Sequence, residues 1–324
     1  MKIKNKTAIV YDIEIFPNLF MCTLKDTETK EVYVVEISDR ESNISLLYDL
    51  FSNEDYIFVG YNIIHYDNII INFLIQYRRT IEQTLDEEIL SNLFGLSNLI
   101  VNDVQHEQWK KFKYAKYFDT LDLMTMLYSS KLRVSLKEMQ VTMKYPNVEE
   151  YSGDFSVPIL LNDIPIVQQY NLNDVESTEE LLYRCEKDIE LRVGIEEEFN
   201  VDVLSKDGMT IGTEILKHKY LEKSNKRWED IKDLRSPCDK IELKDIIFPN
   251  VSFKTKQLQD LLKEMKSLTI GLNRKGFEKI IVLQDMKVVV SVGGIHGDTG
   301  CEQIIPEENE RLLDSDVALI QWRK

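Results

Sequence analysis

The stretch TAIVYDIE, Thr7 to Glu14, decides the fold. Its β-branched and apolar residues alternate as in a β-strand, and both faces carry apolar side chains, which is typical of a central strand. The Pro17-Asn18 pair marks a turn, and strands are predicted over residues 19–24 and 32–37, with a second turn at 26–30. Because the turns are short, the three strands are expected to form an antiparallel meander.

Helices are predicted to cover the faces of this sheet. The apolar run YIFVGY at 56–61 is typical of a buried strand, and apolar residues with helical spacing follow at 67–77. A strand–helix crossover after a meander indicates an α/β fold with a mixed sheet flanked by helices. Three further elements are expected: a helix over 42–51, one helix and a loop region over 80–118, and a strand or helix start over 118–123.

The second half of the chain begins with a long helix. Asn162-Asp163 followed by Pro165 predicts its start, and the helical pattern continues to about residue 199, with Ser177 and Glu180 marking a bend or a fresh helix. Composition then changes, and a strong strand is predicted over 288–292 beside a cluster of glycines. Two domains are therefore expected, residues 1–195 and residues 196–324.

The composition argues against several classes of protein. The chain has 324 residues and a net charge of −16, which does not suit a protein that coats nucleic acid by bulk charge. Its four cysteines lie far apart without a CxxC pair, so neither a zinc site nor a disulfide framework is expected. Without a long apolar run or a signal-peptide cleavage site, we expect no membrane partner and a cytoplasmic location.

Basic residues nonetheless gather in one short segment. Lys110, Lys111, Lys113 and Lys116 are interleaved with four aromatic residues, Trp109, Phe112, Tyr114 and Tyr117. This alternation suits a contact with a single strand of nucleic acid. A solvated face with scattered aromatic anchors explains the same pattern equally well.

Two carboxylates lie on the first strand. Asp12 and Glu14 are two residues apart, so the period of a strand points both to the same face. On a buried sheet these groups repel each other and lose hydration, and a bound cation is the simplest relief. The alternative is the exposed polar edge of a half-buried strand.

Two further motifs place polar groups where ligands commonly bind. Asn62 follows the strand at 56–61 and Asp67 opens the next helix, where strand ends meet helix starts. Tyr170 and Asp174 are four residues apart on the long helix, so both side chains lie on one face. Taken singly, Asp67 is better explained as a helix cap, and a core tyrosine beside a solvated aspartate is a common explanation of the Tyr170–Asp174 pair.

In their order along the chain, the three motifs resemble the DEDD superfamily of 3′→5′ exonucleases in its tyrosine branch, which includes proofreading domains of DNA polymerases. The motifs are Asp-x-Glu, Asn-x4-Asp and Tyr-x3-Asp, and FDTLDL at 118–123 and SLKEM at 135–139 resemble the segment between the second and third. The histidine branch places its base five residues before the last aspartate, where this chain has Gln169. The resemblance covers roughly residues 7–195 and implies an RNase H-like fold.

The resemblance also implies two divalent metal ions, Mg²⁺ or Mn²⁺, about 3.5–4 Å apart. Asp12 would bridge both ions, Glu14 and Asp174 would complete the ion that activates water, and Asp67 would hold the second. Tyr170 would orient the nucleophile, since a phenol with a pKa of about 10 is a poor base at neutral pH. Position alone makes three residues candidates for binding the terminal nucleotide: Phe16, Asn62 and Tyr66.

The C-terminal region resembles the start of the palm in phage-type, family B-like DNA polymerases. VVVSVGGIHGDTG at 288–300 precedes LLDSDVALIQ, in which Asp316 matches the first metal-binding aspartate of the palm. NVDVLSKDGMTIGTEIL at 200–216 resembles the join between exonuclease and polymerase. The chain departs from the motif after Ala318, so it resembles a polymerase truncated at the first palm motif, and polymerase activity is not expected from it alone. An unrelated hairpin is the alternative reading of the glycine cluster.

The expected function is that of a proofreading-type 3′→5′ exonuclease acting on a single-stranded DNA 3′ end or a primer terminus. One alternative is a free-standing nuclease of the same superfamily that acts on RNA. Another is an interaction subunit, in which residues 196–324 dock onto the separately encoded half of a split DNA polymerase or onto another replication protein. For a phage-encoded chain, the expected location is the cytoplasm of the host cell.

Overall fold

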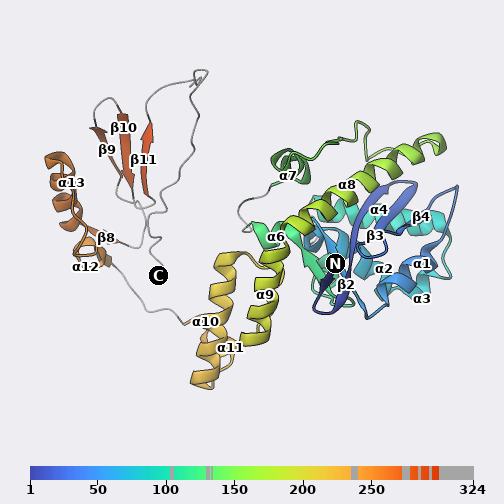
Figure 1. Cartoon of the computed structure of the whole chain (residues 1–324), viewed down its shortest axis with the longest axis horizontal. Coiled ribbons are helices and arrows are strands. Elements are labelled where there is room, and N and C mark those ends of the chain that lie inside the picture. Colours follow the sequence, from blue (N-terminus) through green and yellow to red (C-terminus); the bar gives the residue numbers. More distant parts are fainter. Residues whose placement is uncertain are drawn as a thin grey trace. The chain divides into compact units, whose positions relative to one another are not determined.

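The chain divides into two compact units, Met1–Trp228 and Glu229–Lys324 (Figure 1). The computed structural model describes residues 1–102, 106–128, 132, 134–234, 240–271, 278–283, 286–291 and 294–298. The boundary predicted at residue 195, where the composition changes, stays a prediction. In the described part of the chain, no helix is both long enough and apolar enough to cross a membrane.

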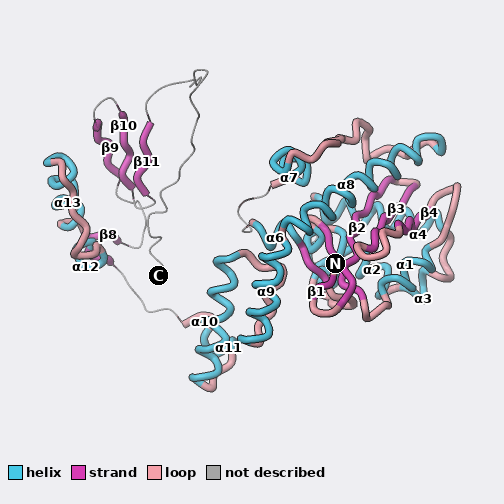
Figure 2. The backbone as a smooth tube through the Cα atoms, in the orientation of Figure 1, coloured by secondary structure: helices cyan, strands magenta, loops and turns pink. Residues whose placement is uncertain are grey.

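A mixed sheet forms the centre of the first unit (Figure 2). The antiparallel meander is confirmed, because β2 (Lys6–Phe16), β3 (Leu19–Asp26) and β4 (Val32–Ile37) pair in succession. β5 (Tyr56–Gly60) then pairs parallel with β2, and β6 (Thr120–Asp122) pairs parallel with β5. The short β1 (Lys2–Ile3) adds to β2. The strand order β4-β3-β2-β5-β6 places β2 in the middle, as its apolar faces predict.

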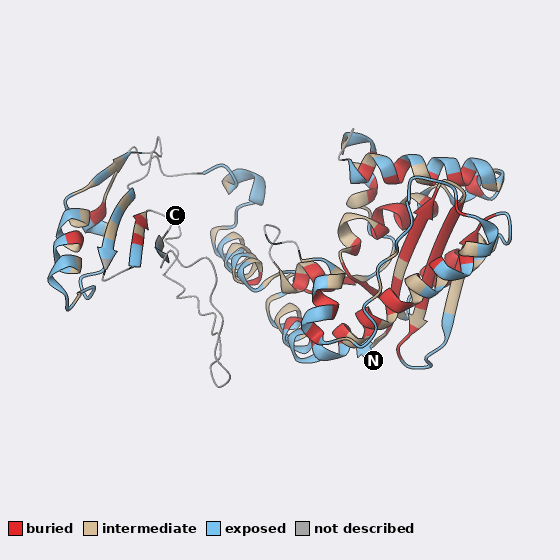
Figure 3. Ribbon diagram, turned by 90° about the horizontal axis from the view of Figure 1, so that it is seen from above, coloured by how far each residue is buried: buried red, intermediate tan, exposed pale blue. Residues whose placement is uncertain are grey.

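Buried residues gather in the central sheet and in the helices that cover it (Figure 3). The alternation of β2 divides this core between the two faces of the sheet. Its odd-numbered residues, such as Ile9 and Ile13, pack with α1 (Ile44–Phe51), α2 (Asp67–Gln76), α4 (Asp86–Val101) and α5 (His106–Lys113). Its even-numbered residues Ala8 and Val10 pack with α7 (Leu136–Met143), α8 (Ile164–Arg184) and α9 (Glu186–Phe199). Each buried aliphatic side chain contributes about 1.5–3 kcal/mol to folding, so this division fixes the register of β2.

Several predicted elements differ from the structure. The described residues of the segment 80–118 hold two helices, α4 and α5, after the short α3 (Arg78–Ile81), rather than one helix and a loop. Residues 118–123 contain both alternatives in succession, because β6 leads directly into α6 (Leu123–Leu127). The long helix continues through Ser177 and breaks at Cys185. Ser177 is buried and accepts a hydrogen bond from Gln140 at 2.7 Å, so it packs within the helix instead of capping a new one.

Short elements complete the described chain. The first unit also holds two 3-10 helices, η1 (Ile63–His65) and η2 (Leu161–Asp163), and the helix α10 (Gly208–Ser224), while α11 (Trp228–Ile231) spans the division. In the second unit, residues 288–291 of the predicted strand lie in β10 (Met286–Ser291), between β9 (Glu278–Leu283) and β11 (Gly294–Asp298). The remaining elements there are β7 (Lys240–Glu242), α12 (Leu243–Ile246), α13 (Lys256–Lys266) and β8 (Thr269–Gly271). Val292, Gly293, Gly300 and the predicted palm aspartate Asp316 lie outside the described residues.

Candidate metal centre

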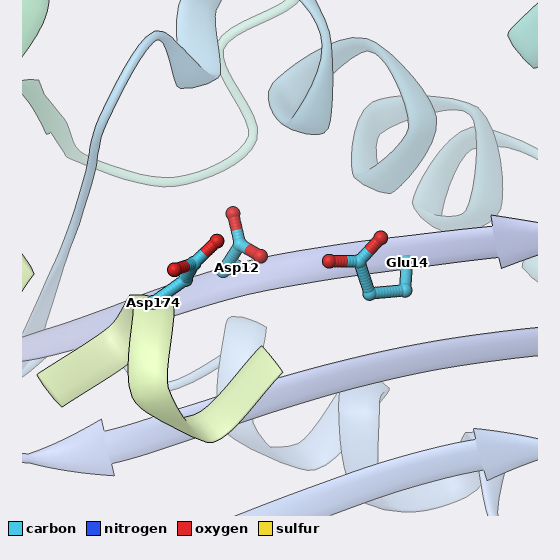
Figure 4. A group of neighbouring side chains, drawn as sticks. All are labelled: Asp12, Glu14 and Asp174. Carbon is cyan, nitrogen blue, oxygen red and sulfur yellow. The ribbon is translucent and has the colours of Figure 1, made fainter. Parts of the chain in front are cut away.

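Asp12 and Glu14 project from the same face of β2, as their spacing predicts (Figure 4). The parallel pairing of β2 with β5 ends at Val10 and Val59, two residues before Asp12. The two carboxylates therefore lie where β5 has ended and its chain has turned away. Glu14 is only 9% exposed and Asp12 is half-buried, so both are largely removed from water.

Asp174 reaches the same place from α8. The helix packs across β2 and β3, and its Asn171 ties it to the sheet: the amide donates to Asp12 at 2.7 Å and its oxygen accepts the Thr23 N–H at 3.1 Å. Carboxylate oxygens of Asp12, Glu14 and Asp174 all lie within 4.8 Å of one another. The structure thus brings together three of the four predicted ligands.

Asp67 lies beside this group at the first residue of α2. Its Oδ1 accepts the Ile13 N–H at 3.2 Å, on the backbone between Asp12 and Glu14. The three-carboxylate group does not include Asp67, but among the neighbouring charges its charge raises the pKa of Asp12 the most. Asp67 is 5% exposed, so it is a buried carboxylate next to the group rather than a solvated helix cap.

The four carboxyls hold their protons more tightly than carboxyls in water. Burial raises the pKa of Asp12, and the charges of Asp67, Glu14 and Asp174 raise it further. Burial, followed by the charges of Asp174 and Asp67, raises the pKa of Glu14 to about 8, and burial raises that of Asp67 to about 7. The pKa of Asp174 is also raised by burial. Oxygen ligands crowded at this density suit a hard divalent cation, whose charge stabilises their ionised forms.

Lys137 is a member of the site that the sequence reasoning did not single out. It lies in the first turn of α7, whose start is fixed by a capping box between Ser135 and Glu138. Its ammonium pairs with Asp174 and lies 4.5 Å from the centre of the Tyr170 ring. The positive charge lowers the pKa of Asp12, Glu14 and Asp174, so it offsets part of their repulsion.

The hydroxyl of Tyr170 adjoins the carboxylates, as the spacing of four predicts. Its hydrogen bond to Asp174 lowers the pKa of that carboxyl. Burial, followed by the charges of Asp174, Glu14 and Asp12, raises the pKa of Tyr170 itself. The phenol therefore keeps its proton at neutral pH and acts as a hydrogen-bond donor, not as a base.

The three residues predicted to bind a terminal nucleotide are differently placed. Phe16 is buried, with the Phe155 ring stacked 4.9 Å from it and the Tyr151 ring 5.6 Å away, so these rings would have to move before a base could stack on it. Tyr66 is half-buried, and its hydroxyl shares a hydrogen bond of 2.7 Å with Ser97.

Asn62, the third of these residues, has a left-handed backbone with φ of 64°. It is held by Asp122, a fully buried carboxylate that the sequence reasoning did not identify. Asp122 accepts the backbone N–H groups of Asn62, Ile64, Met124 and Thr125. Burial raises its pKa to about 6, and these hydrogen bonds lower it. Asp122 thus joins the segment leading to Asp67 with the start of α6, which is a structural role.

No family model, curated protein or solved structure matches the chain. The case for its function therefore rests on the geometry and chemistry of the carboxylate site.

Proposed function

We propose that this chain is a metal-dependent 3′→5′ exonuclease that hydrolyses a DNA strand from its 3′ end, and that its mixed sheet is RNase H-like. One observation carries the proposal: oxygens of Asp12, Glu14 and Asp174 lie within 4.8 Å of one another, with the buried Asp67 beside them. Carboxylates in this number and at this separation match what a two-metal phosphodiester hydrolase requires.

The donor set favours Mg²⁺ or Mn²⁺, because all of the converging ligand atoms are carboxylate oxygens. Asp12, Glu14 and Asp174 would hold one ion, and Asp12 with Asp67 a second. When bound, such ions activate water, neutralise charge on the phosphorane and stabilise the leaving oxygen. This chain's own residues would do the positioning: Asn171 orients the Asp12 carboxylate at 2.7 Å, and the Tyr170 hydroxyl, which donates to Asp174, would accept a hydrogen bond from the attacking water.

The 3′→5′ direction of digestion and two further parts of the proposal rest on the sequence resemblance alone. The preference for DNA over RNA comes from residues 288–318, which resemble the start of a polymerase palm. The same resemblance underlies the assignment of residues 196–324 to an incomplete polymerase domain. We propose all three on that basis, without polymerase activity for this chain.

Digestion of end-labelled single strands tests the proposal. With Mg²⁺, a 5′-labelled DNA strand should give a ladder of shortening products, while a 3′-labelled strand should release labelled mononucleotide at once. EDTA should stop both reactions. A matched RNA strand tests the preference for DNA. Internal cuts without shortening from the 3′ end, or digestion that persists in EDTA, would rule the proposal out.

Replacing Tyr170 by phenylalanine should slow digestion about 10- to 100-fold without abolishing it, the size expected for one lost hydrogen bond to a reacting group. The ring stays in place, so the melting temperature should remain near that of the wild type. Tyr183→Phe is a matched control on the same helix, because its hydroxyl bonds Lys30 and the Thr27 carbonyl instead of the site. Turnover by Tyr170→Phe at the control's rate would remove the tyrosine from the mechanism.

A further inference from the structure

A second surface of the first unit has the chemistry of a binding site but contains none of the four carboxylates. It is a cleft of about 760 Å³ whose walls come from the N-terminal strands, the segment between α1 and β5, the start of α2, the segment after α5 and the segment after α9. Ile64 and Asn68 form part of one wall, so the cleft adjoins the chain segment that carries Asp67. Its remaining charged and aromatic lining includes Lys4, Lys6, Lys113, Tyr114, Lys116, Tyr117 and Lys206.

The charge of this cleft contrasts with that of the whole chain. Five lysines line it against three acids, Glu54, Asp119 and Asp202, although the chain carries a net charge of −16. Lys4 pairs with Glu196, a carboxylate that is 9% exposed and lies outside the cleft lining. Two of the other lysines pair with lining acids, Lys6 with Asp119 at 2.8 Å and Lys116 with Asp202 at 2.7 Å. Both acids are well exposed, and exposed ion pairs are weak enough for an incoming phosphate to replace the carboxylate.

Two tyrosine rings at the cleft are exposed to water. Tyr114 is 66% exposed and Tyr117 is 48% exposed, although both are large rings that usually bury most of their surface. Exposed rings beside lysines match the requirements of a single strand of nucleic acid, whose bases stack on the rings while its phosphates meet the ammonium groups. An acidic polypeptide would use the lysines but would leave both rings without a stacking partner.

We propose that this cleft binds single-stranded nucleic acid and holds a part of the strand away from the carboxylates. The cleft is lined by five lysines, at residues 4, 6, 113, 116 and 206, which are more than one phosphate needs, so they suit a series of phosphates better than one phosphate. The identification of this strand as the substrate rests on the proposed function. The binding itself does not, because none of the residues invoked belongs to the carboxylate site.

Binding is measured on the full chain in excess EDTA, by fluorescence anisotropy of a labelled oligothymidylate about 16 nucleotides long. The double variant Tyr114→Ala/Tyr117→Ala should bind about tenfold more weakly or worse, as expected for lost stacking. Lys113→Ala/Lys116→Ala should also weaken binding, and each lost phosphate contact should reduce the salt dependence by about 0.7 in the log–log slope.

Two controls match these variants in chemistry. Lys187→Ala removes an exposed lysine from α9 outside the cleft, and Tyr220→Ala removes a tyrosine that is 52% exposed on α10. Both should bind like the wild type. Melting curves establish that the variants are folded.

Three results would overturn the proposal. In the first, the cleft variants bind oligothymidylate with wild-type affinity. In the second, polyglutamate of equal charge displaces the strand as well as unlabelled oligothymidylate does. In the third, thymidine monophosphate displaces the strand at the same nucleotide concentration. If the wild type digests DNA while the cleft variants bind normally, the proposed binding site is wrong and the proposed exonuclease function stands. If the cleft variants lose binding and the wild type digests no DNA, the proposed binding site stands and the proposed exonuclease function is wrong.

Discussion

Asp12→Ala should abolish Mg²⁺-dependent digestion, with a loss of at least about 1,000-fold, while the chain stays folded. Asp12 is the residue that contacts or senses every other carboxylate of the site. One of its oxygens lies within 4.8 Å of carboxylate oxygens of Glu14 and Asp174, and the charge of Asp67 raises its pKa. Removing a ligand shared by two metal ions should cost about 4 kcal/mol or more of transition-state stabilisation, or roughly 1,000-fold in rate. Initial rates on end-labelled single strands measure the loss.

A second substitution separates loss of the ligand from loss of the fold. Asp12→Asn keeps the size of the side chain and removes its charge, so it should be as inactive as Asp12→Ala. In EDTA at pH 8 its melting temperature should equal or exceed that of the wild type, because one of four crowded carboxylates no longer ionises. Asp39→Ala removes an exposed carboxylate elsewhere and should digest normally. Wild-type rates in either Asp12 variant would refute the metal centre.

The parts of the site that the sequence predicts are those set by local periodicity. Asp12 and Glu14 share a face because a strand repeats every two residues, and Tyr170 and Asp174 share one because a helix returns after about four. Neither inference needs knowledge of the rest of the fold. The sheet was predictable for the same reason, since its meander depends on short turns between apolar runs.

The parts that the sequence did not predict depend on contacts between distant segments. Lys137 meets Asp174 only because α7 packs beside α8, and nothing in the SLKEM stretch indicates that partner. Likewise, Phe16 is apolar at a position beside the site, but its cover comes from Tyr151 and Phe155, in a segment with neither helical nor strand periodicity. Loops of this kind are positioned by packing, so local pattern says little about them.

The bend or fresh helix predicted at Ser177 shows a different limit of sequence-based prediction. Ser177 and Glu180 have the spacing of a capping box, which predicts a helix start. In the structure the Ser177 hydroxyl bonds the Gln140 side chain and the Asp174 carbonyl, so tertiary contacts satisfy it within the helix. A capping motif is therefore decisive only where the backbone N–H groups that follow it lack helical partners.

In the absence of metal, the protein should become less stable as pH rises from 5 to 8. Burial raises the pKa of all four carboxyls, to about 7 for Asp67 and about 8 for Glu14, and the neighbouring carboxylates raise the pKa of Asp12 and Glu14 further. A raised pKa means that the folded state holds protons that the unfolded state releases. The contribution of these protons to the free energy of unfolding is complete below pH about 4, the pKa of a carboxyl in the unfolded chain. It is lost as the pH rises through the pKa values of the folded state.

The size of this effect is large enough to measure by scanning calorimetry in EDTA. Each pKa unit corresponds to about 1.4 kcal/mol, so several kcal/mol should be lost across this range. For a unit of this size, that corresponds to roughly a 10 °C fall in melting temperature. Carboxyls whose pKa is lowered, such as Glu179 beside Lys25 and Lys30, do not oppose this trend, because they lose stability only at lower pH.

Mg²⁺ should reverse the loss at pH 8 and do little at pH 5, because carboxylates must release their protons before they bind a metal. Lys137→Met should make the fall with pH steeper, since its ammonium lowers the pKa of Asp12, Glu14 and Asp174. Lys187→Met, an exposed lysine on α9, is the matched control and should follow the wild type. Two results would contradict this account, in which the carboxyls bind protons in the absence of metal and bind Mg²⁺ once the protons are lost. One is a melting temperature that is constant or rises between pH 5 and 8 in EDTA. The other is an equal stabilisation by Mg²⁺ at both pH values.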